Sequence, residues 1–176
     1  MAGAGRAAQP AERARAAIAA CRALGLAAGQ IDAGLRTNPG LPHRMERVRK
    51  VGGVTFVNDS KATNPTSTAP ALAAFPHIHW IAGGLAKTGD LDACVPFLSH
   101  VRAAYLIGDA APRFAGLLHG KVPVINAERL DRAVAMAAAA AHPGDTVLLS
   151  PACASYDQFT DFAARGAAFK ALVGAL

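Results

Sequence analysis

The sequence is short of charge, aromatic side chains and cysteine, and each shortage narrows what the chain can be. Only 17% of the 176 residues are charged and 52% are hydrophobic, which excludes a disordered chain and fits one globular domain with at most an appendage. One tryptophan and two tyrosines, with no basic residues clustered around aromatic ones, give no groove for stacking nucleic-acid bases. The three cysteines show no CxxC spacing, so neither a disulfide framework nor a zinc site is indicated.

Long apolar runs are also missing. No stretch approaches the roughly 18 apolar residues of a membrane span, and the first residues contain no uninterrupted apolar segment of the kind found in secretory signals. We therefore expect a cytoplasmic protein that has neither a membrane nor a nucleic acid as partner. The net charge of +6 is interpreted as solubility charge, although it could also favour anionic ligands.

What is present divides the chain into a short helical segment, residues 1–39, and an α/β domain, residues 40–176. Residues 1–9 are rich in glycine and alanine and are predicted to be disordered. Helices are expected over 11–28, ended by Gly29, and over 31–35. The peptide Thr37-Asn38-Pro39-Gly40 then breaks the chain and predicts a linker.

Beyond residue 40, short apolar segments alternate with helical patterns. The predicted strands cover residues 54–58, 78–82, 103–107, 122–125 and 146–149, and the pattern allows a further strand over 45–50. The predicted helices cover residues 65–75, 91–99, 111–118, 128–141 and 160–174. This alternation predicts a Rossmann-like, mostly parallel sheet with helices on both faces.

Polar or glycine-rich peptides follow four of the predicted strands. They are Asn58–Asn64, Gly83–Lys87, Gly108–Asp109 and Ser150–Ser155. In an open parallel sheet, ligands bind beyond the carboxyl ends of the strands. The sequence therefore predicts that one rim of the sheet gathers the side chains of Lys61, Thr63, Lys87 and Ser155.

Each of these side chains also has a purely structural interpretation. The helix after Lys61 is predicted to be capped by Thr63 or Asn64, and its free N–H groups favour an anion; plain capping beside a solvated lysine is the alternative. The second peptide is not a phosphate loop, because Ala86 stands where a Walker A motif needs glycine. Lys87 is then either a point charge for a carboxylate or an ordinary surface lysine.

The last peptide predicts a capping box, in which Ser155 caps a helix and Gln158 reaches back to it. A substrate carboxylate could bind the same helix start. Cys153 lies in this loop, and we expect a small buried cysteine rather than a nucleophile, since no histidine is spaced to activate it. No metal site is predicted, because no acidic or histidine cluster accompanies His43.

Three peptides, in this order, resemble the Mur ligase family and, within it, the ligases that add D-glutamate. They are Gly40-Leu41-Pro42-His43-Arg44-Met45-Glu46, Asn58-Asp59-Ser60-Lys61-Ala62-Thr63-Asn64, and the stretch from Leu148 to Phe159. The resemblance implies an ATP-dependent acid–amino-acid ligase of peptidoglycan synthesis with three domains. Residues 40–176 are similar to the third, amino-acid-binding domain, and residues 1–39 to the helical tail of the central ATPase domain.

The resemblance also implies roles for individual residues. D-glutamate contacts are expected from Thr63, Lys87, Ser155, Tyr156 and Phe162. Nucleotide contacts are expected from Arg44 and Asp59, and Lys61 is the expected catalytic contact to a phosphate or to the reaction intermediate. The implied cofactors are ATP and Mg, and the implied partners are D-glutamate, ATP or ADP, and UDP-N-acetylmuramoyl-L-alanine.

Departures from the family pattern limit what this chain is expected to do alone. It contains no P-loop, Arg13 stands about where an adenine-binding asparagine belongs, and Tyr156 replaces the usual leucine. We therefore expect the isolated chain to be inactive. Two alternatives stay open: another Mur or folylpolyglutamate-type ligase domain, and a ligand-binding remnant without catalysis. A hydrolase built on Cys153 is a more distant third.

Overall fold

The computed structural model describes residues 10–38 and 40–176, so the expectation of disorder over 1–9 lies outside the described residues. The chain forms two compact units, Met1–Gly40 and Leu41–Leu176. The first unit contains helices α1 (Pro10–Ala23) and α2 (Ala28–Thr37). The prediction of one helix running to residue 28 is wrong, because Gly25 adopts φ +82 just after α1 and turns the chain there.

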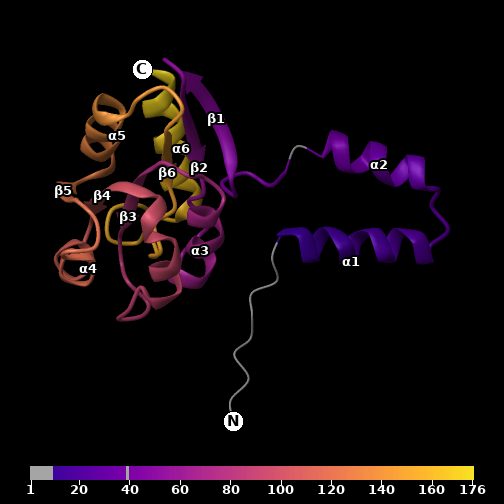
Figure 1. Ribbon diagram of the computed structural model, residues 1–176, viewed down its shortest axis with the longest axis horizontal. Coiled ribbons are helices and arrows are strands. Elements are labelled where there is room, and N and C mark those ends of the chain that lie inside the picture. Colours follow the sequence, from indigo (N-terminus) through magenta and orange to yellow (C-terminus); the bar gives the residue numbers. More distant parts are fainter. Residues whose placement is uncertain (1–9, 39) are drawn as a thin grey trace, which may run out of the picture. The chain divides into compact units, whose positions relative to one another are not determined.

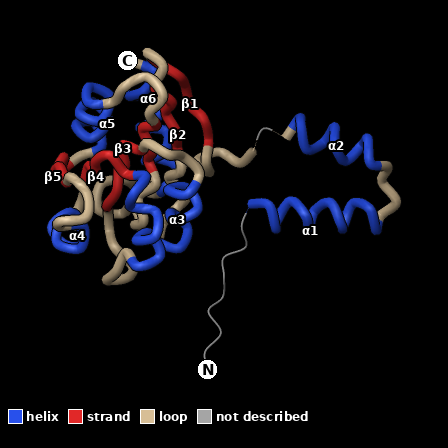
Figure 2. The backbone as a smooth tube through the Cα atoms, in the orientation of Figure 1, coloured by secondary structure: helices blue, strands red, loops and turns tan. Residues whose placement is uncertain are grey.

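The second unit contains six strands and five helices. Figures 1 and 2 show the strands lying side by side with helices around them. Its strands are β1 (Glu46–Val51), β2 (Val54–Asn58), β3 (Ile78–Gly83), β4 (Val101–Ile107), β5 (Val124–Glu128) and β6 (Thr146–Leu149). Its helices are α3 (Pro65–Ala73), the 3-10 helix η1 (Asp92–His100), α4 (Ala111–Leu118), α5 (Leu130–Ala140) and α6 (Phe162–Gly174).

The six strands form one sheet in the order β1-β2-β6-β3-β4-β5. Strand β1 pairs antiparallel with β2, and every other pairing is parallel. The predicted mostly parallel α/β sheet is confirmed. The five parallel strands end at the same edge, so the loops after β2, β6 and β3 lie next to one another.

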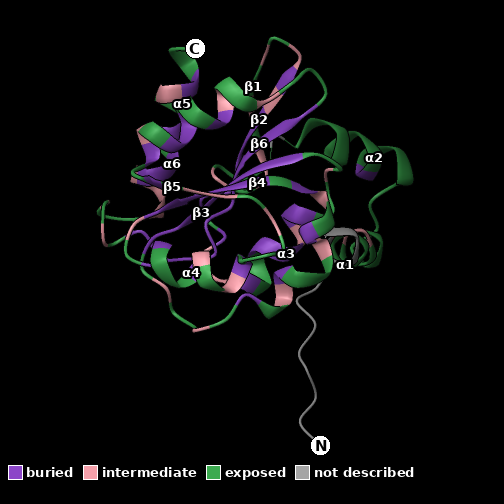
Figure 3. Cartoon of the chain, turned by 60° about the vertical axis from the view of Figure 1, so that its left-hand side comes forward, coloured by how far each residue is buried: buried purple, intermediate pink, exposed green. Residues whose placement is uncertain are grey.

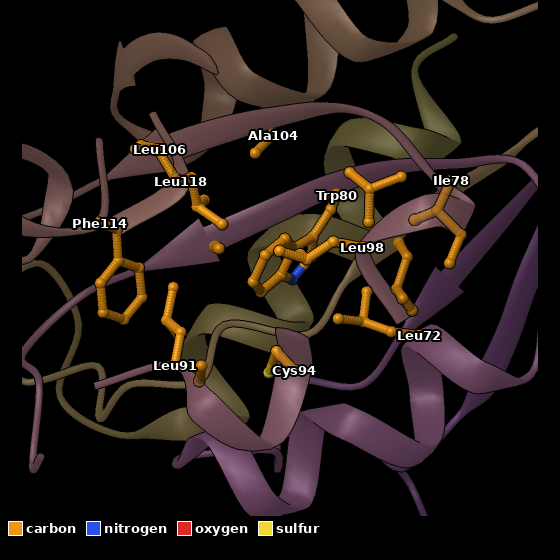
Figure 4. Packing of buried hydrophobic residues seen from close by; sticks show 14 of the residues in the cluster. Leu72, Ile78, Trp80, Leu91, Cys94, Leu98, Ala104, Leu106, Phe114 and Leu118 are labelled. Carbon is orange, nitrogen blue, oxygen red and sulfur yellow. The ribbon is translucent and has the colours of Figure 1, made fainter. Parts of the chain in front are cut away.

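Helices cover both faces of this sheet, as expected. On one face, Trp80 and Leu148 pack with Leu72 of α3 and Phe114 of α4, and Figure 4 shows the Trp80 ring in the middle of this cluster. On the other face, side chains of β2, β3, β4 and β6 pack against α5 and α6. Figure 3 shows the strands as the buried layer and the helices exposing their outer sides. The alternation of strand side chains between two apolar layers fixes the register.

Several predicted boundaries needed correction. The helix predicted over 91–99 is the 3-10 helix η1 (Asp92–His100), which contains Pro96, a residue that cannot donate an α-helical hydrogen bond. Strand β5 runs from Val124 to Glu128 rather than over 122–125, and α5 begins at Leu130 rather than at residue 128. The Asn64 cap of α3 is confirmed, since its side chain accepts a hydrogen bond from the Ser67 amide at 2.9 Å.

Candidate functional site

Three neighbouring loops form the candidate site at the carboxyl edge of the sheet. The loop after β3 is tied to the loop after β6 by a pair of backbone hydrogen bonds between Leu85 and Ala154, each 2.9 Å long. The Gly83 amide donates to the Pro151 carbonyl in the same region. Lys87 and Ser155 therefore belong to loops that are bonded to each other, at one end of the sheet.

Lys87 faces the loop after β2. Its ammonium nitrogen lies 3.5 Å from the hydroxyl oxygen of Thr63. Lys87 is exposed and Thr63 is half-buried, so the Lys87 ammonium group is accessible to a ligand. A cation beside a hydroxyl that can donate or accept a hydrogen bond is suited to a carboxylate.

Lys61 and Phe162 form a second contact at this edge. The Lys61 ammonium lies 3.8 Å from the centre of the Phe162 ring, a cation–π distance. The Lys61 amide donates to the His43 carbonyl, and the imidazole of His43 stands edge-on to the Phe162 ring at 6.2 Å. The structure thus brings Lys61 together with the first residue of α6.

Asp59 is buried rather than displayed to solvent, with 4% of its surface exposed. Its carboxylate accepts hydrogen bonds from the Ser150 hydroxyl at 2.8 Å and from the Met45 amide at 3.1 Å. Burial raises the pKa of Asp59 to about 6, against the opposing effects of these hydrogen bonds and of the Arg44 charge. Arg44 itself is exposed.

Arg44 and Asp59 are the two residues expected from the sequence to contact a nucleotide. Exposed Arg44 can reach a phosphate group, since a guanidinium forms paired hydrogen bonds with phosphate oxygens. Both oxygens of Asp59 already accept hydrogen bonds inside the domain. Of the two residues, only Arg44 is therefore exposed to a phosphate, whereas Asp59 is buried and bonded within the domain, and the sequence contains no P-loop.

Arg165 is a component of the site that the sequence reasoning missed. Only 1% of its surface is exposed, and its guanidinium donates to the hydroxyl and the carbonyl of Ser60, both at 3.0 Å. It also donates to the carbonyls of Cys153 and Ala154, at 3.0 and 3.2 Å. Arg165 therefore holds together the loops after β2 and β6. A single arginine inside a predicted helix gives no sequence signal of such a role.

The capping-box prediction at Ser155 is wrong. Helix α6 begins at Phe162, and its cap is Asp161, whose side chain accepts a hydrogen bond from the Ala164 amide at 2.7 Å. Gln158 instead donates to the Glu128 carbonyl, at 2.7 Å. Seven residues from Ser155 to Asp161 thus form a segment without regular structure, in which Ser155 is buried and Tyr156 is 69% exposed.

Cys153 does not have the properties of a nucleophile. Its surface is fully buried, and burial raises the pKa of its thiol to about 12. A thiol that stays protonated at neutral pH is unreactive. The structure therefore argues against a hydrolase built on Cys153.

Other features of the described residues lie outside this edge or are absent. A cavity of about 620 Å³ is lined mostly by residues of α5 and α6, namely Arg129, Leu130, Asp131, Gln158, Phe159, Ala168, Ala171 and Leu172, and none of the predicted site residues lines it. Across residues 10–38 and 40–176, no group of three His, Cys, Asp or Glu side chains is placed to hold a metal ion. No helix in the same part of the chain is long and apolar enough to cross a bilayer.

Comparison with known proteins places this chain in a family. The family described as "Mur ligase, glutamate ligase domain" matches residues 43–153. Two similar curated proteins, both named UDP-N-acetylmuramoylalanine–D-glutamate ligase, come from Novosphingobium aromaticivorans and Sphingopyxis alaskensis. The first is 58% identical over 160 residues, which is 91% of this chain and 36% of the relative. The second is 55% identical over 171 residues, or 94% of this chain and 39% of the relative. The chain therefore spans less than two fifths of their length.

Solved structures agree on the fold. UDP-N-acetylmuramate-alanine ligase from Thermotoga maritima superposes with a TM-score of 0.67 at 13% identity, over 94% of this chain and 37% of that protein. A bifunctional folylpolyglutamate synthase/dihydrofolate synthase from Yersinia pestis gives a TM-score of 0.59 at 19% identity, over 84% of this chain and 35% of that protein. With a family match that covers well over half of its residues, the chain belongs to the Mur ligase family.

Proposed function

We propose that this chain is the amino-acid-binding domain of an ATP-dependent ligase that adds D-glutamate to UDP-N-acetylmuramoyl-L-alanine in peptidoglycan synthesis. The observation that carries the proposal is the 3.5 Å approach of the Lys87 ammonium to the Thr63 hydroxyl, at the edge where Ser155 also lies. The names of the relatives at 51–58% identity support D-glutamate as the amino acid.

In this proposal the chain binds and orients D-glutamate. Lys87 is the counter-ion of one carboxylate and Thr63 its hydrogen-bonding partner. Ser155, Tyr156 and Phe162 line the other side, with the exposed Tyr156 contributing its backbone. Lys61, next to Phe162, brings a positive charge toward the reacting phosphate or intermediate. Placing reactants and balancing charge suffices for such a role, because no protein nucleophile is needed.

The nucleotide and the metal are proposed to be held mainly outside this chain. ATP, with Mg, would supply the phosphoryl group that converts the muramoyl-alanine carboxylate into a reactive acyl phosphate, with ADP as the leaving group. Arg44 approaches the nucleotide from this side, and Asp59 orders the loop that carries Arg44 through its bond to the Met45 amide. Residues 1–39 are proposed to be the helical tail of the ATPase domain. The three unpaired cysteines are consistent with the proposed cytoplasmic location.

Calorimetric titration of the 176-residue chain tests the amino-acid specificity. We expect saturable binding of D-glutamate and no binding of L-lysine or meso-diaminopimelate. The affinity for D-glutamate should be weak, because in this proposal the domains that close the cleft lie outside this chain. Equal binding of L-lysine or diaminopimelate would indicate a different ligase of the family. A folded chain that binds none of them would indicate a remnant without a ligand.

A coupled assay for ADP release tests the proposal that the ATPase part of the enzyme lies outside this chain. With ATP, UDP-N-acetylmuramoyl-L-alanine and D-glutamate all present, we expect the isolated chain to give only background. Turnover above background would contradict the proposal that the ATPase part lies elsewhere.

A further inference from the structure

The segment between Ser155 and Phe162 carries no regular secondary structure, yet the proposed D-glutamate contacts stand at its two ends. Ser155 and Tyr156 open the segment, and Phe162 follows it as the first residue of α6. The position of these contacts therefore depends on whatever holds the residues between them.

Asp157 ties the segment to the end of β4. Its carboxylate accepts a hydrogen bond from the Asp109 amide at 3.2 Å. Gly108, the preceding residue, has φ +67, and a Cβ built on it would lie 1.9 Å from the Oδ2 atom of Asp157. The carboxylate thus occupies the space in which any side chain at position 108 would stand, so the two residues fit each other.

A second tie joins the segment to the end of β5. The Gln158 side chain donates to the Glu128 carbonyl at 2.7 Å, and the Gly108 amide donates to the same carbonyl at 3.0 Å. Glu128 has φ +62, which is uncommon for a residue other than glycine. Within the segment, the Phe159 amide donates to the Ser155 carbonyl at 2.8 Å. The segment is therefore anchored to two strand ends and closed on Ser155.

The charge of Asp157 also complements the buried cation beneath the loops. Among the described residues, no carboxylate lies within ion-pair distance of Arg165, which is bonded only to neutral oxygen atoms. Burial lowers the pKa of Arg165 to about 10, and the nearby Cys153 and Asp157 oppose that shift. Asp157 thus lies near Arg165 and partly opposes the effect of its burial, without forming an ion pair with it.

We propose that Asp157 is a positioning residue for amino-acid binding, which anchors the Ser155–Asp161 segment on Gly108 and Asp109 and so places Ser155, Tyr156 and Phe162. Asp157 has no contact of its own with the ligand in this proposal. The inference rests on the proposed function, because it concerns the placement of the same D-glutamate contacts.

Two variants and a control distinguish the loss of the Asp157 contacts from a general loss of stability. Asp157→Ala removes the acceptor and the charge, whereas Asp157→Asn keeps an acceptor oxygen of the same reach. Asp32→Ala is the control, since it removes one carboxylate from an exposed ion pair in the helical unit. For each variant of the 176-residue chain, amide hydrogen exchange is measured without ligand, and D-glutamate affinity is measured by NMR titration.

We expect Asp157→Ala to lower the exchange protection of the Phe159 amide about tenfold, with α5 unaffected, and to weaken D-glutamate binding about tenfold. Asp157→Asn should retain most of the exchange protection and most of the D-glutamate affinity, and Asp32→Ala should change neither quantity. If Asp157→Ala binds D-glutamate as the unaltered chain does, the positioning role is wrong while the proposed function stands. If the unaltered chain shows no D-glutamate response although Asp157→Ala loosens the segment, the proposed function fails and Asp157 is a structural anchor only.

Discussion

The guanidinium of Arg165 and the backbone and hydroxyl oxygens of Ser60 are joined by two hydrogen bonds of 3.0 Å, across 105 residues of sequence. This contact links α6 to the loop that carries Lys61. Because the same guanidinium also binds the carbonyls of Cys153 and Ala154, two of the three site loops depend on one side chain.

Removing that side chain should therefore destabilise the domain. Arg165→Met keeps most of the apolar stem but leaves buried carbonyl groups without a donor. We expect the free energy of unfolding to fall by about 3 kcal/mol, the relief of a buried charge offsetting part of a larger loss. Urea unfolding followed by Trp80 fluorescence measures it, with Arg36→Met in the exposed Asp32 pair as control. Equal stability of Arg165→Met and the unaltered chain would show that the links do not matter.

Asp59 should make stability depend on pH in the direction opposite to that of most acids. Its pKa is about 6 in the folded chain and 3.8 as the ordinary value, so the folded state holds the proton more tightly than the unfolded state. The tighter proton binding therefore adds roughly 3 kcal/mol to the free energy of unfolding. This contribution is fully present below about pH 4 and is lost as the pH rises through about 6.

Asp59→Asn provides the comparison, because an amide cannot ionise. We expect the free energy of unfolding of the variant, relative to that of the unaltered chain, to increase by roughly 3 kcal/mol as the pH is raised from about 4 to about 7. Denaturant unfolding at each pH measures this difference. A stability difference that does not change with pH would mean that Asp59 titrates alike in the folded and unfolded chain.

The thiols should react at different rates. Cys94 and Cys153 are fully buried, and burial raises the pKa of each to about 12, whereas Cys21 is only half-buried. With a disulfide reagent at neutral pH, we expect one thiol to react rapidly and two to react only when the chain unfolds. Mass spectrometry of the labelled peptides identifies them; early labelling of Cys153 would refute its assignment as an inert core residue.

Two glycines in helices should respond oppositely to alanine. A Cβ on Gly166 of α6 would stand 2.2 Å from the His43 imidazole nitrogen, whereas one on Gly116 of α4 meets nothing within 4 Å. Gly116→Ala should therefore stabilise the chain by up to about 1 kcal/mol, through helix propensity. Gly166→Ala should destabilise it by about 2 kcal/mol, because His43 must move away from Asn58. Thermal unfolding of both variants measures these changes. A Gly166→Ala variant more stable than the unaltered chain would contradict the packing of His43 against Gly166.

The sheet could be predicted from sequence because apolar strands alternate with helical patterns and four of the predicted strands end in a polar or glycine-rich peptide. The ends of β2, β6 and β3 meet because these strands are neighbours, an order that no local pattern reveals. The capping box at Ser155 failed for a related reason. Gln158 finds the Glu128 carbonyl, a partner 30 residues away, and the helix starts seven residues after Ser155. Long-range contacts such as those of Arg165 have no signature in the sequence.

NMR titration of the 176-residue chain with D-glutamate tests directly whether the carboxyl edge of the sheet binds an acidic amino acid. We expect the backbone amides that shift to lie in residues 61–63, 84–87 and 153–156. We also expect Lys87→Ala to abolish the response, whereas Lys121→Ala, on the surface beyond α4, leaves it unchanged. Shifts confined to the opposite edge, around His77 and His142, or a response that survives Lys87→Ala, would contradict binding at the carboxyl edge.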